Sequence, residues 1–332
     1  MTQTNFIGIG EIEAARERIA ATIRLTPINV SDTLSTIADV PVHLKLEHLQ
    51  HTGSFKLRGA ANAVSLLSDE ERAAGVVGVS TGNHGRALAH AAKASGVRCV
   101  ICMSRLVPQV KVDGIRALGA EVRIVGRSQD EAQAEVDKLV AEGMTMIPPF
   151  DHPAVIAGQG TLGLEIVEQI PEVDTVVVPL SGGGLIAGVA AACKARNRDI
   201  RIVGITMERG AAMIASLKAG APIEVEEQPT LADSLGGGIG LSNRYTFAMT
   251  RDLVDETHLI NEAQIAAGMR HAYWRERQIV EGAGAVGIAA VLAQMFEPKG
   301  PVALILSGGN VDMAQHFRVI GGEDVDLMKE VA

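Results

Sequence analysis

The sequence predicts an α/β fold with two domains, each built on a mostly parallel sheet flanked by helices. The chain has 332 residues, which favours two domains or one large α/β unit. Short β-branched runs alternate with segments of helical spacing, and this alternation is typical of parallel sheets. Apolar residues make up 47% of the chain and aromatic residues only 3%, so the core must be aliphatic.

Three elements are expected before this alternation begins. Residues 11–23 have the spacing of a helix, residues 42–46 fit a strand, and residues 54–67 fit a second helix. Ser54 has a side chain that commonly caps a helix N-terminus. We therefore expect it to be the N-cap of the second helix.

Two series of strands and helices follow. The first series has strands at 76–80, 97–103 and 122–125, with helices at 83–95, 108–118 and 128–142. The second series has a helix at 154–170, a strand at 175–180, a helix from Leu185 and a strand at 200–206. Residues 207–254 are harder to assign, and helices at 262–276 and 283–295 and a strand at 302–306 come after them.

A cluster of prolines separates the two series. Pro148, Pro149 and Pro153 lie at the point where the chain is expected to cross between domains. We therefore predict a small domain over residues 70–149 and a large domain over residues 1–69 and 150–332.

The charge and hydropathy of the chain argue against two classes of partner. The net charge is −9 and the pI is near 5.5, so nucleic acid and anionic membrane are not expected, whereas a small-molecule substrate is. Residues 175–193 are uncharged over nearly the length of a membrane span, but Pro179 and the glycines at 182–184 interrupt them. A buried strand, a tight turn and a helix are expected there.

The cysteines indicate a compartment rather than a site. Cys99, Cys102 and Cys193 are too few for a disulfide framework, and no secretory signal precedes Arg16, so the cytoplasm is expected. Cys99 and Cys102 have the spacing of a metal or redox site. They lie in a predicted strand, however, where residues three apart face opposite sides, so we expect both in the core and predict no metal site.

Four short segments interrupt the regular pattern where open α/β sheets place their ligands. The first, Ser54-Phe55-Lys56-Leu57-Arg58-Gly59, puts Lys56 in the first turn of a helix. This place favours anions over cations, so a functional lysine here would have a lowered pKa and would be a neutral nucleophile. A solvated surface lysine is the alternative.

The second segment, Ser80-Thr81-Gly82-Asn83-His84-Gly85, lies between a predicted strand and a predicted helix. Its hydroxyl groups and free backbone N–H groups would form a cradle for a carboxylate. The alternative is an ordinary capped turn, in which His84 would be a structural histidine.

The third and fourth segments also follow predicted strands. Residues 179–185 contain three successive glycines, which let the backbone approach a phosphate at the start of a helix. They fit a dinucleotide-binding turn poorly, with Ala187 and Glu208 at the further positions, so a nicotinamide enzyme is a minor alternative. In Ser307-Gly308-Gly309-Asn310 the hydroxyl would meet a ring nitrogen or cap a turn.

In this order the four segments resemble those of the fold-type II enzymes that use pyridoxal 5′-phosphate, whose fold is tryptophan synthase β-like. The resemblance is in particular to the threonine and serine dehydratases and to serine racemase. Residues 154–161 and 281–285 are similar to further segments of the same family, so the resemblance covers nearly the whole chain.

This resemblance implies a role for each segment. Lys56 would hold the cofactor as a Schiff base, with Phe55 against the pyridine ring and Asn83 bound to the 3′ oxygen. Ser307 would face the ring nitrogen. The remaining implied contacts are the phosphate at Ser181, Gly182, Gly183, Gly184 and Leu185, and the substrate carboxylate at Ser80, Thr81, Asn83 and His84. A homodimer is usual for the family.

The implied reaction removes the β-hydroxyl of a small hydroxy amino acid and gives a 2-oxo acid and ammonia. Lys56 would take the α-proton. Unlike a carboxylate, the hydroxyl of Ser307 does not favour a protonated ring nitrogen, so the ring is a weaker electron sink. Prompt loss of a β leaving group is then preferred over transamination, and a pyridoxal phosphate-dependent lyase is expected.

Several positions depart from the family pattern. Thr81 replaces the serine that is the second base of serine racemase, which disfavours racemisation. Arg86 replaces a glutamine and would suit 3-hydroxyaspartate or the hydroxylated diaminobutyrates handled by the dehydratase of hydroxyectoine breakdown; otherwise it points to solvent or pairs with an acid. Ser234 replaces a glycine with no effect that the sequence reveals. Ile214 replaces an aspartate of the metal site that some relatives have near Glu208.

Other functions stay open at this point. A serine or aspartate racemase and a β-replacement enzyme would use the same cofactor, although the second typically has threonine at the position of His84. Outside enzymes, the alternative is a binding protein on the same scaffold. The presence of Lys56 together with Ser307 argues against that alternative.

Overall fold

The chain forms two sheets in a computed structural model that describes residues 6–80, 82–105, 107, 109–126 and 129–328. The larger sheet has the strand order β1-β2-β10-β7-β8-β9, and the smaller has the order β5-β4-β3-β6. The strands are β1 (Ile28–Val30), β2 (Val42–Lys45), β3 (Val76–Val79), β4 (Cys99–Met103), β5 (Glu121–Ile124), β6 (Thr145–Met146), β7 (Thr175–Pro179), β8 (Arg201–Met207), β9 (Glu256–Ile260) and β10 (Val302–Ile305). Only β1 pairs antiparallel among these described strands.

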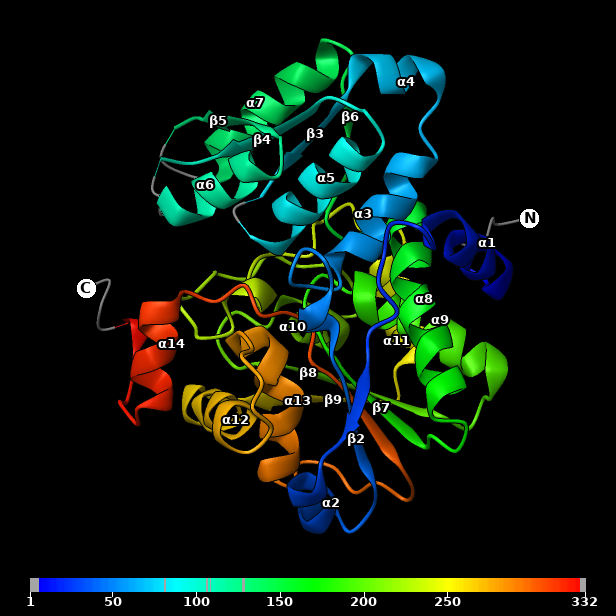
Figure 1. Cartoon of the computed structure of the whole chain (residues 1–332), viewed down its shortest axis with the longest axis vertical. Helices are drawn as coiled ribbons and strands as arrows, with labels where there is room; N and C mark the ends of the chain where they lie inside the picture. The colour runs from blue at the N-terminus through cyan, green and yellow to red at the C-terminus, as the bar shows by residue number, and fades with distance from the viewer. Residues whose placement is uncertain (1–5, 81, 106, 108, 127–128, 329–332) are drawn as a thin grey trace.

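Helices cover both faces of each sheet (Figure 1). The α-helices are α1 (Ile9–Ile19), α2 (Asp32–Ala38), α3 (Lys56–Ser65), α4 (Asp69–Ala74), α5 (Asn83–Ala94), α6 (Gln109–Ala117), α7 (Gln129–Ala141), α8 (Pro153–Gln169), α9 (Gly184–Arg196), α10 (Ala212–Ala219), α11 (Thr246–Leu253), α12 (Glu262–Trp274), α13 (Gly282–Leu292) and α14 (Met313–Ile320). Two short 3₁₀ helices are Glu47–Leu49 and Asp233–Leu235.

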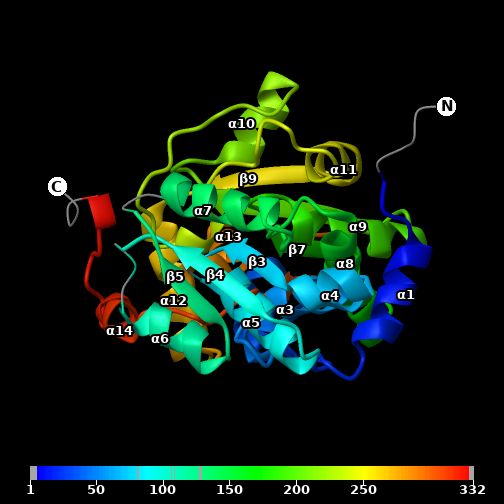
Figure 2. The same ribbon diagram turned by 90° about the horizontal axis from the view of Figure 1, so that it is seen from above.

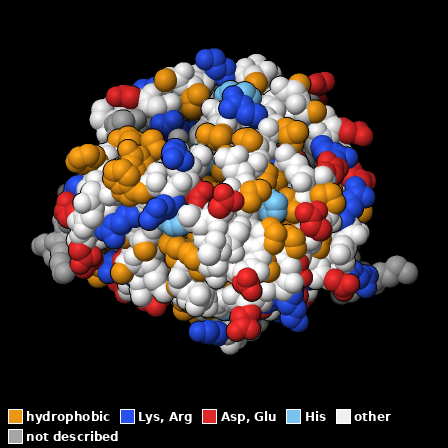
Figure 3. Space-filling view, turned by 60° about the horizontal axis from the view of Figure 1, so that its bottom comes forward, with side chains coloured by type: hydrophobic (Ala, Val, Ile, Leu, Met, Phe, Trp, Pro, Cys, Tyr) orange, Lys and Arg blue, Asp and Glu red, His pale blue; other side chains and the backbone are white. Residues whose placement is uncertain are grey.

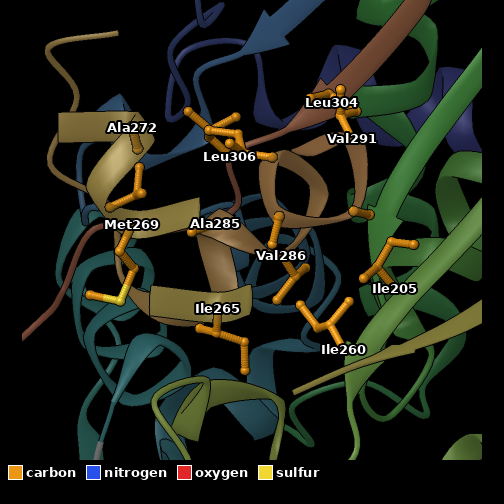
Figure 4. Packing of buried hydrophobic residues seen from close by; sticks show 14 of the residues in the cluster. Ile205, Ile260, Ile265, Met269, Ala272, Ala285, Val286, Val291, Leu304 and Leu306 are labelled. Carbon is orange, nitrogen blue, oxygen red and sulfur yellow. The ribbon is translucent and has the colours of Figure 1, made fainter. Parts of the chain in front are cut away.

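The large sheet separates two aliphatic cores, because successive side chains of a strand point to opposite faces. On β7, Val177 packs in the core beneath α12 and α13, whereas Val176 and Val178 pack in the core beneath α8 and α9. Figure 4 shows the first of these cores, with Val286 of α13 and Ile260 of β9 among the residues that meet there.

The small sheet is arranged in the same way. One face packs against α3, α5 and α6 and the other against α7, as Figure 2 shows for α5, α6 and α7. Cys99 lies in the core of the first face and Cys102 in the core of the second. The prediction that these two cysteines are core residues on opposite sides of one strand is therefore confirmed.

The predicted fold class and most predicted elements are confirmed. Residues 175–193 form β7, a glycine turn and most of α9, and none of the described helices is long and apolar enough to cross a membrane. The sequence did not predict the short strands β1, β6 and β9, the helices α2, α4 and α14, or the helices of residues 207–254. The domain boundaries at residues 70 and 149 stay a prediction.

The prediction that Ser54 caps the second helix is wrong. The helix begins at Lys56, and Phe55 occupies the N-cap position with helical dihedral angles. Ser54 instead forms a β-bridge with Gly308, and the N–H of Phe55 donates to the carbonyl of Ser307 at 3.0 Å. A tertiary contact with the segment that follows β10 therefore takes the place of a local cap.

Candidate active site

A cavity of about 470 Å³ lies where the carboxyl ends of strands from both sheets meet. The end of β3 contributes Val79 and Ser80, the end of β7 contributes Pro179 and Ser181, and Ser307 follows β10. All four sequence segments reach this cavity, although they are far apart along the chain. The sheet topology thus brings together four segments that are far apart in the sequence.

Lys56 is the first residue of α3, and its side chain lies in the cavity. Its Nζ donates a hydrogen bond to the carbonyl oxygen of Pro149 at 2.8 Å and lies 5.2 Å from the centre of the Phe55 ring. Burial lowers the pKa of Lys56 to about 8, against the opposing charge of Glu281. The pKa is lowered as expected, but the cause is burial and not the helix N-terminus; because the side chain lines the cavity, Lys56 is not a solvated surface lysine.

Asn83 is held at both ends of its amide. Its Nδ2 donates to the carboxylate of Glu281 at 2.7 Å, and its Oδ1 accepts from Nδ2 of Asn310 at 2.6 Å. Asn310 also donates to the carbonyl of Thr52 at 2.9 Å. This chain of hydrogen bonds fixes the orientation of Asn83 at the start of α5.

Glu281 is a site residue that our sequence analysis did not select. It precedes α13, is 3% exposed and lines the cavity. A signal was present, because Glu281 is the single charged residue directly before a helix made only of glycine and aliphatic residues. A buried carboxylate needs partners, and a buried charge near a cleft is typical of functional sites.

The second segment combines a capped turn with a cavity wall. The hydroxyl of Ser80 accepts from the N–H groups of Gly82 at 3.3 Å and Gly85 at 3.0 Å, so it satisfies an N–H in the first turn of α5, although Gly82 occupies the N-cap position. Nε2 of His84 bonds the carbonyl of Ile147 at 2.8 Å, which places the ring proton on Nε2. Thr81 lies outside the described residues.

His84 is a neutral ring in this environment. Burial, together with the positive charge of Lys56, lowers the pKa of His84 to about 4. The side chain is therefore uncharged at neutral pH, and it still faces the cavity. A role for Ser80 and His84 in holding a carboxylate stays a prediction.

The glycine turn leads directly into α9, and its shape depends on close packing. A Cβ on Gly182 would lie 2.4 Å from the Phe150 ring, and one on Gly184 would lie 2.9 Å from the Phe150 backbone. Gly183 has a φ of +87°, a conformation that favours glycine. Ser181, Gly182, Gly183, Gly184 and Leu185 all line the cavity.

Ser307 lines the cavity and is buried. Its hydroxyl is 3.5 Å from the carbonyl oxygen of Ala283, a long contact that leaves it able to meet another group. Because its own carbonyl accepts from Phe55, Ser307 also fixes the chain next to Lys56.

Two of the departures from the family pattern occupy different places. Arg86 is not among the residues that line the cavity; its guanidinium packs against α6, where a Cβ on Gly114 would collide with it. Ser234 does line the cavity, and its hydroxyl is 3.5 Å from Nδ2 of Asn83. In the described part of the chain, no group of three or more His, Cys, Asp or Glu side chains is arranged to hold a metal ion.

A buried charge network, also absent from our sequence analysis, supports the helix that carries Lys56. The guanidinium of Arg58 is fully buried and bonds the carboxylates of Glu47 and Glu165 at 2.7–2.8 Å. Nζ of Lys45 adds a bond to Glu165 at 2.6 Å. Burial alone would raise the pKa of Glu47, but Arg58, Thr26 and Lys45 together outweigh it and lower that pKa.

Comparisons with known proteins agree with this site. The family model described as "Pyridoxal-phosphate dependent enzyme" matches residues 19–308. The chain is 59% identical to a "Putative threonine dehydratase" of Sinorhizobium fredii over 97% of this chain and 98% of that protein. It is 40% identical to the L-threonine ammonia-lyase of Thermotoga maritima over 95% of this chain and 78% of that protein.

The fold is also similar to a solved structure. Maize serine racemase superposes with a TM-score of 0.89 at 34% identity, covering 95% of this chain and 97% of the racemase. The similarity therefore extends over both sheets.

Proposed function

The chain belongs to the family of pyridoxal-phosphate dependent enzymes, and we propose that it is an ammonia-lyase that removes the β-hydroxyl of a small hydroxy amino acid. The products are a 2-oxo acid and ammonia. The observation that carries this proposal is the Lys56 amine, which burial makes easy to deprotonate and which lies in the same cavity as the glycine turn and Ser307.

The residues of the cavity fit pyridoxal phosphate. Phe150 fills the space where side chains on Gly182 and Gly184 would stand, so the turn presents bare backbone at the N-terminus of α9. Such a terminus favours a phosphate. Lys56 would hold the aldehyde carbon, Asn83 the 3′ oxygen and Ser307 the ring nitrogen, with Phe55 beside the ring.

The chain's own residues divide the work of the reaction. Bound pyridoxal phosphate supplies an aldehyde that condenses with amines and a ring that withdraws electrons from the α-carbon. Lys56, with its lowered pKa, is suited to take the α-proton near neutral pH. Neutral His84 adds no positive charge that would raise the cost of protonating Lys56. Asn83, held by Glu281 and Asn310, keeps one orientation throughout.

The cavity wall bears on the choice of substrate. Residues 227–238 place Glu227, Asp233 and Ser234 on the wall of the cavity. The carboxylate of Glu227 on this wall would repel a second acidic group, whereas Arg86 packs against α6 instead. We therefore propose a threonine- or serine-like substrate, or a hydroxylated diaminobutyrate, ahead of 3-hydroxyaspartate.

The test is an assay of all four substrate types with the purified enzyme. L-Threonine, L-serine, 3-hydroxyaspartate and 3-hydroxy-2,4-diaminobutyrate are each incubated, and 2-oxo acid and ammonia are measured together with any change in chirality. Lys56→Ala should abolish both products and the visible absorbance of the bound cofactor. Turnover and absorbance that survive this substitution would refute the proposal. An Arg86→Gln variant shows whether that residue affects selectivity.

We also propose a homodimer in the cytoplasm. Three free, buried cysteines fit a reducing compartment.

Figure 3 shows acidic and basic side chains interspersed on one face, with a group of hydrophobic side chains near its edge. Trp274 on α12 and Phe317 on α14 are 64% and 73% exposed, which a second copy of the chain would cover. Light scattering of the wild type and of Trp274→Glu tests this assembly.

A further inference from the structure

We propose that Asp151 is a positioning residue that holds the carbonyl of Pro149, and through it the free amine of Lys56. The inference rests on the function proposed above, in which Lys56 is the reactive amine. Asp151 belongs to residues 147–152, the segment that connects β6 to α8. This connecting segment lies outside the four segments discussed from the sequence.

Successive residues of the connecting segment touch successive parts of the site. The carbonyl of Ile147 accepts from His84 at 2.8 Å, and the carbonyl of Pro149 accepts from Lys56 at 2.8 Å. Phe150 fills the space behind the glycine turn. Any displacement of this segment would therefore be felt by the amine and by the turn together.

Asp151 attaches the connecting segment to the large domain. Its Oδ2 accepts from the N–H of Arg244 at 2.6 Å, and its Oδ1 accepts from the N–H groups of Tyr245 and Thr246, each at 2.9 Å. These three groups are at the start of α11. Hydrogen bonds to a carboxylate are stronger than neutral ones, so three of them hold the side chain firmly.

The prolines explain why this attachment matters. Pro148 and Pro149 have no N–H, so the backbone there cannot donate hydrogen bonds of its own. The nearest hydrogen bonds that tie this segment to other elements are those of Ile147, whose N–H donates to the carbonyl of Val77 at 3.1 Å, and of Asp151, on the two sides of the prolines. Together with the packing of Phe150, they set the position of the Pro149 carbonyl, and Asp151 is the anchor at α11.

The test compares two substitutions of Asp151 in the full chain. Asp151→Ala removes all three acceptors, and kcat should fall on the order of 10- to 100-fold, because small displacements of reacting groups have effects of this size. The freed amine should gain contact with water. The pH midpoint for uptake of pyridoxal phosphate by the apoprotein, followed by visible absorbance, should therefore rise above that of the wild type.

Asp151→Asn keeps one side-chain oxygen in the position of Oδ1. It should retain the bonds from Tyr245 and Thr246 and lose the bond from Arg244, so kcat and the uptake midpoint should lie between those of the wild type and Asp151→Ala. If Asp151→Ala does not fold, this variant decides alone: a lower kcat with a higher midpoint supports the proposal, and wild-type values overturn it.

Asp312→Ala is the matched control. Asp312 accepts from the N–H groups of Ala314 at 2.8 Å and Gln315 at 3.0 Å, so it also caps a helix, but it is not among the residues lining the cavity. It should lose thermal stability while keeping kcat and the uptake midpoint. If Asp151→Ala likewise loses only thermal stability, Asp151 merely caps α11 and the positioning role is refuted. Lys56→Ala that still takes up cofactor and turns over would instead refute the proposed function itself.

Discussion

Asn83 donates a 2.7 Å hydrogen bond to the buried carboxylate of Glu281, although the two residues are 198 positions apart in the chain. Asn83 begins α5 beside the small sheet, and Glu281 precedes α13 beside the large one. The contact therefore joins groups from the two sides of the cavity. Glu281 also acts on Lys56, because its negative charge favours the ammonium form of that lysine.

The first prediction concerns the charge of Glu281. Glu281→Gln keeps an oxygen that can accept from Asn83 but removes the charge that raises the pKa of Lys56. The pKa of Lys56 should then fall below about 8, and the pH midpoint for cofactor uptake should move to a lower pH. Glu168→Gln, which alters an exposed ion pair with Arg16, should leave the midpoint in place. If the midpoint rises in Glu281→Gln, the charge of Glu281 does not raise the pKa of Lys56, and the prediction is wrong.

The second prediction concerns stability. The Lys56 ammonium is destabilising when buried, since its pKa falls from 10.5 to about 8. A tenfold change in proton affinity is worth about 1.4 kcal/mol, so Lys56→Met should stabilise the apoprotein by up to about 3 kcal/mol at pH 7.

The pH dependence of that gain follows from the two pKa values. Below about pH 8 the amine is protonated in both the native and the unfolded chain, so the full cost is present. Between about 8 and 10.5 the unfolded chain binds more protons, and wild-type stability gains on the variant as pH rises. Urea unfolding of both apoproteins at pH 7 and pH 10 measures the difference. If the stability difference between the two proteins is the same at pH 7 and pH 10, burial of the Lys56 charge is not the cause of that difference.

The third prediction concerns Ser234. Its hydroxyl lines the cavity and lies 3.5 Å from Asn83. We expect this hydroxyl to accept a hydrogen bond from the second amino group of 3-hydroxy-2,4-diaminobutyrate, a group that L-threonine does not have. Ser234→Ala and Ser234→Gly should then both lower kcat/KM for the diaminobutyrate relative to L-threonine, by roughly tenfold for the loss of that one hydrogen bond. Steady-state kinetics on the two substrates give the ratio. If the ratio is the same in all three enzymes, the hydroxyl makes no selective contact.

The fourth prediction concerns the buried charges. Arg58→Met leaves the carboxylates of Glu47 and Glu165 without their main partner, and the free energy of unfolding should fall by about 3–5 kcal/mol. Arg98→Ala breaks an exposed pair with Glu121 and should cost less than about 1 kcal/mol. Urea unfolding of the two variants tests this; equal losses would mean that the network contributes no more than a surface pair.

Much of the fold followed from local patterns in the sequence. The alternation at residues 76–146 predicted three of the four strands of the small sheet, because the periodicity of a strand or helix depends only on residues close together in the sequence. β6 was missed because its two residues, Thr145 and Met146, are too short to show a period. Ser54 does not cap α3, since its N-cap propensity is outweighed by the β-bridge to Gly308.

The residues of the candidate site also divide into those with a local sequence signal and those without one. Lys56, the glycine turn and Ser307 could be selected from the sequence, because a cation at a helix start and glycines after a strand are local signals. Glu281 and Asp151 could not be assigned a role in the same way. The meaning of Glu281 depends on Asn83, and that of Asp151 on the N–H groups of residues 244–246.

The sequence alone therefore determined the fold class and the order of most elements, and it singled out Lys56 as the lysine that we propose to be reactive. Only the tertiary structure decided the state of that lysine. Its pKa is lowered by desolvation, and it is the packing of distant segments that buries it: its amine contacts the carbonyl of Pro149, 93 residues away in the chain. Local propensities specify helices and strands, whereas burial and charge at a site are properties of the packed chain.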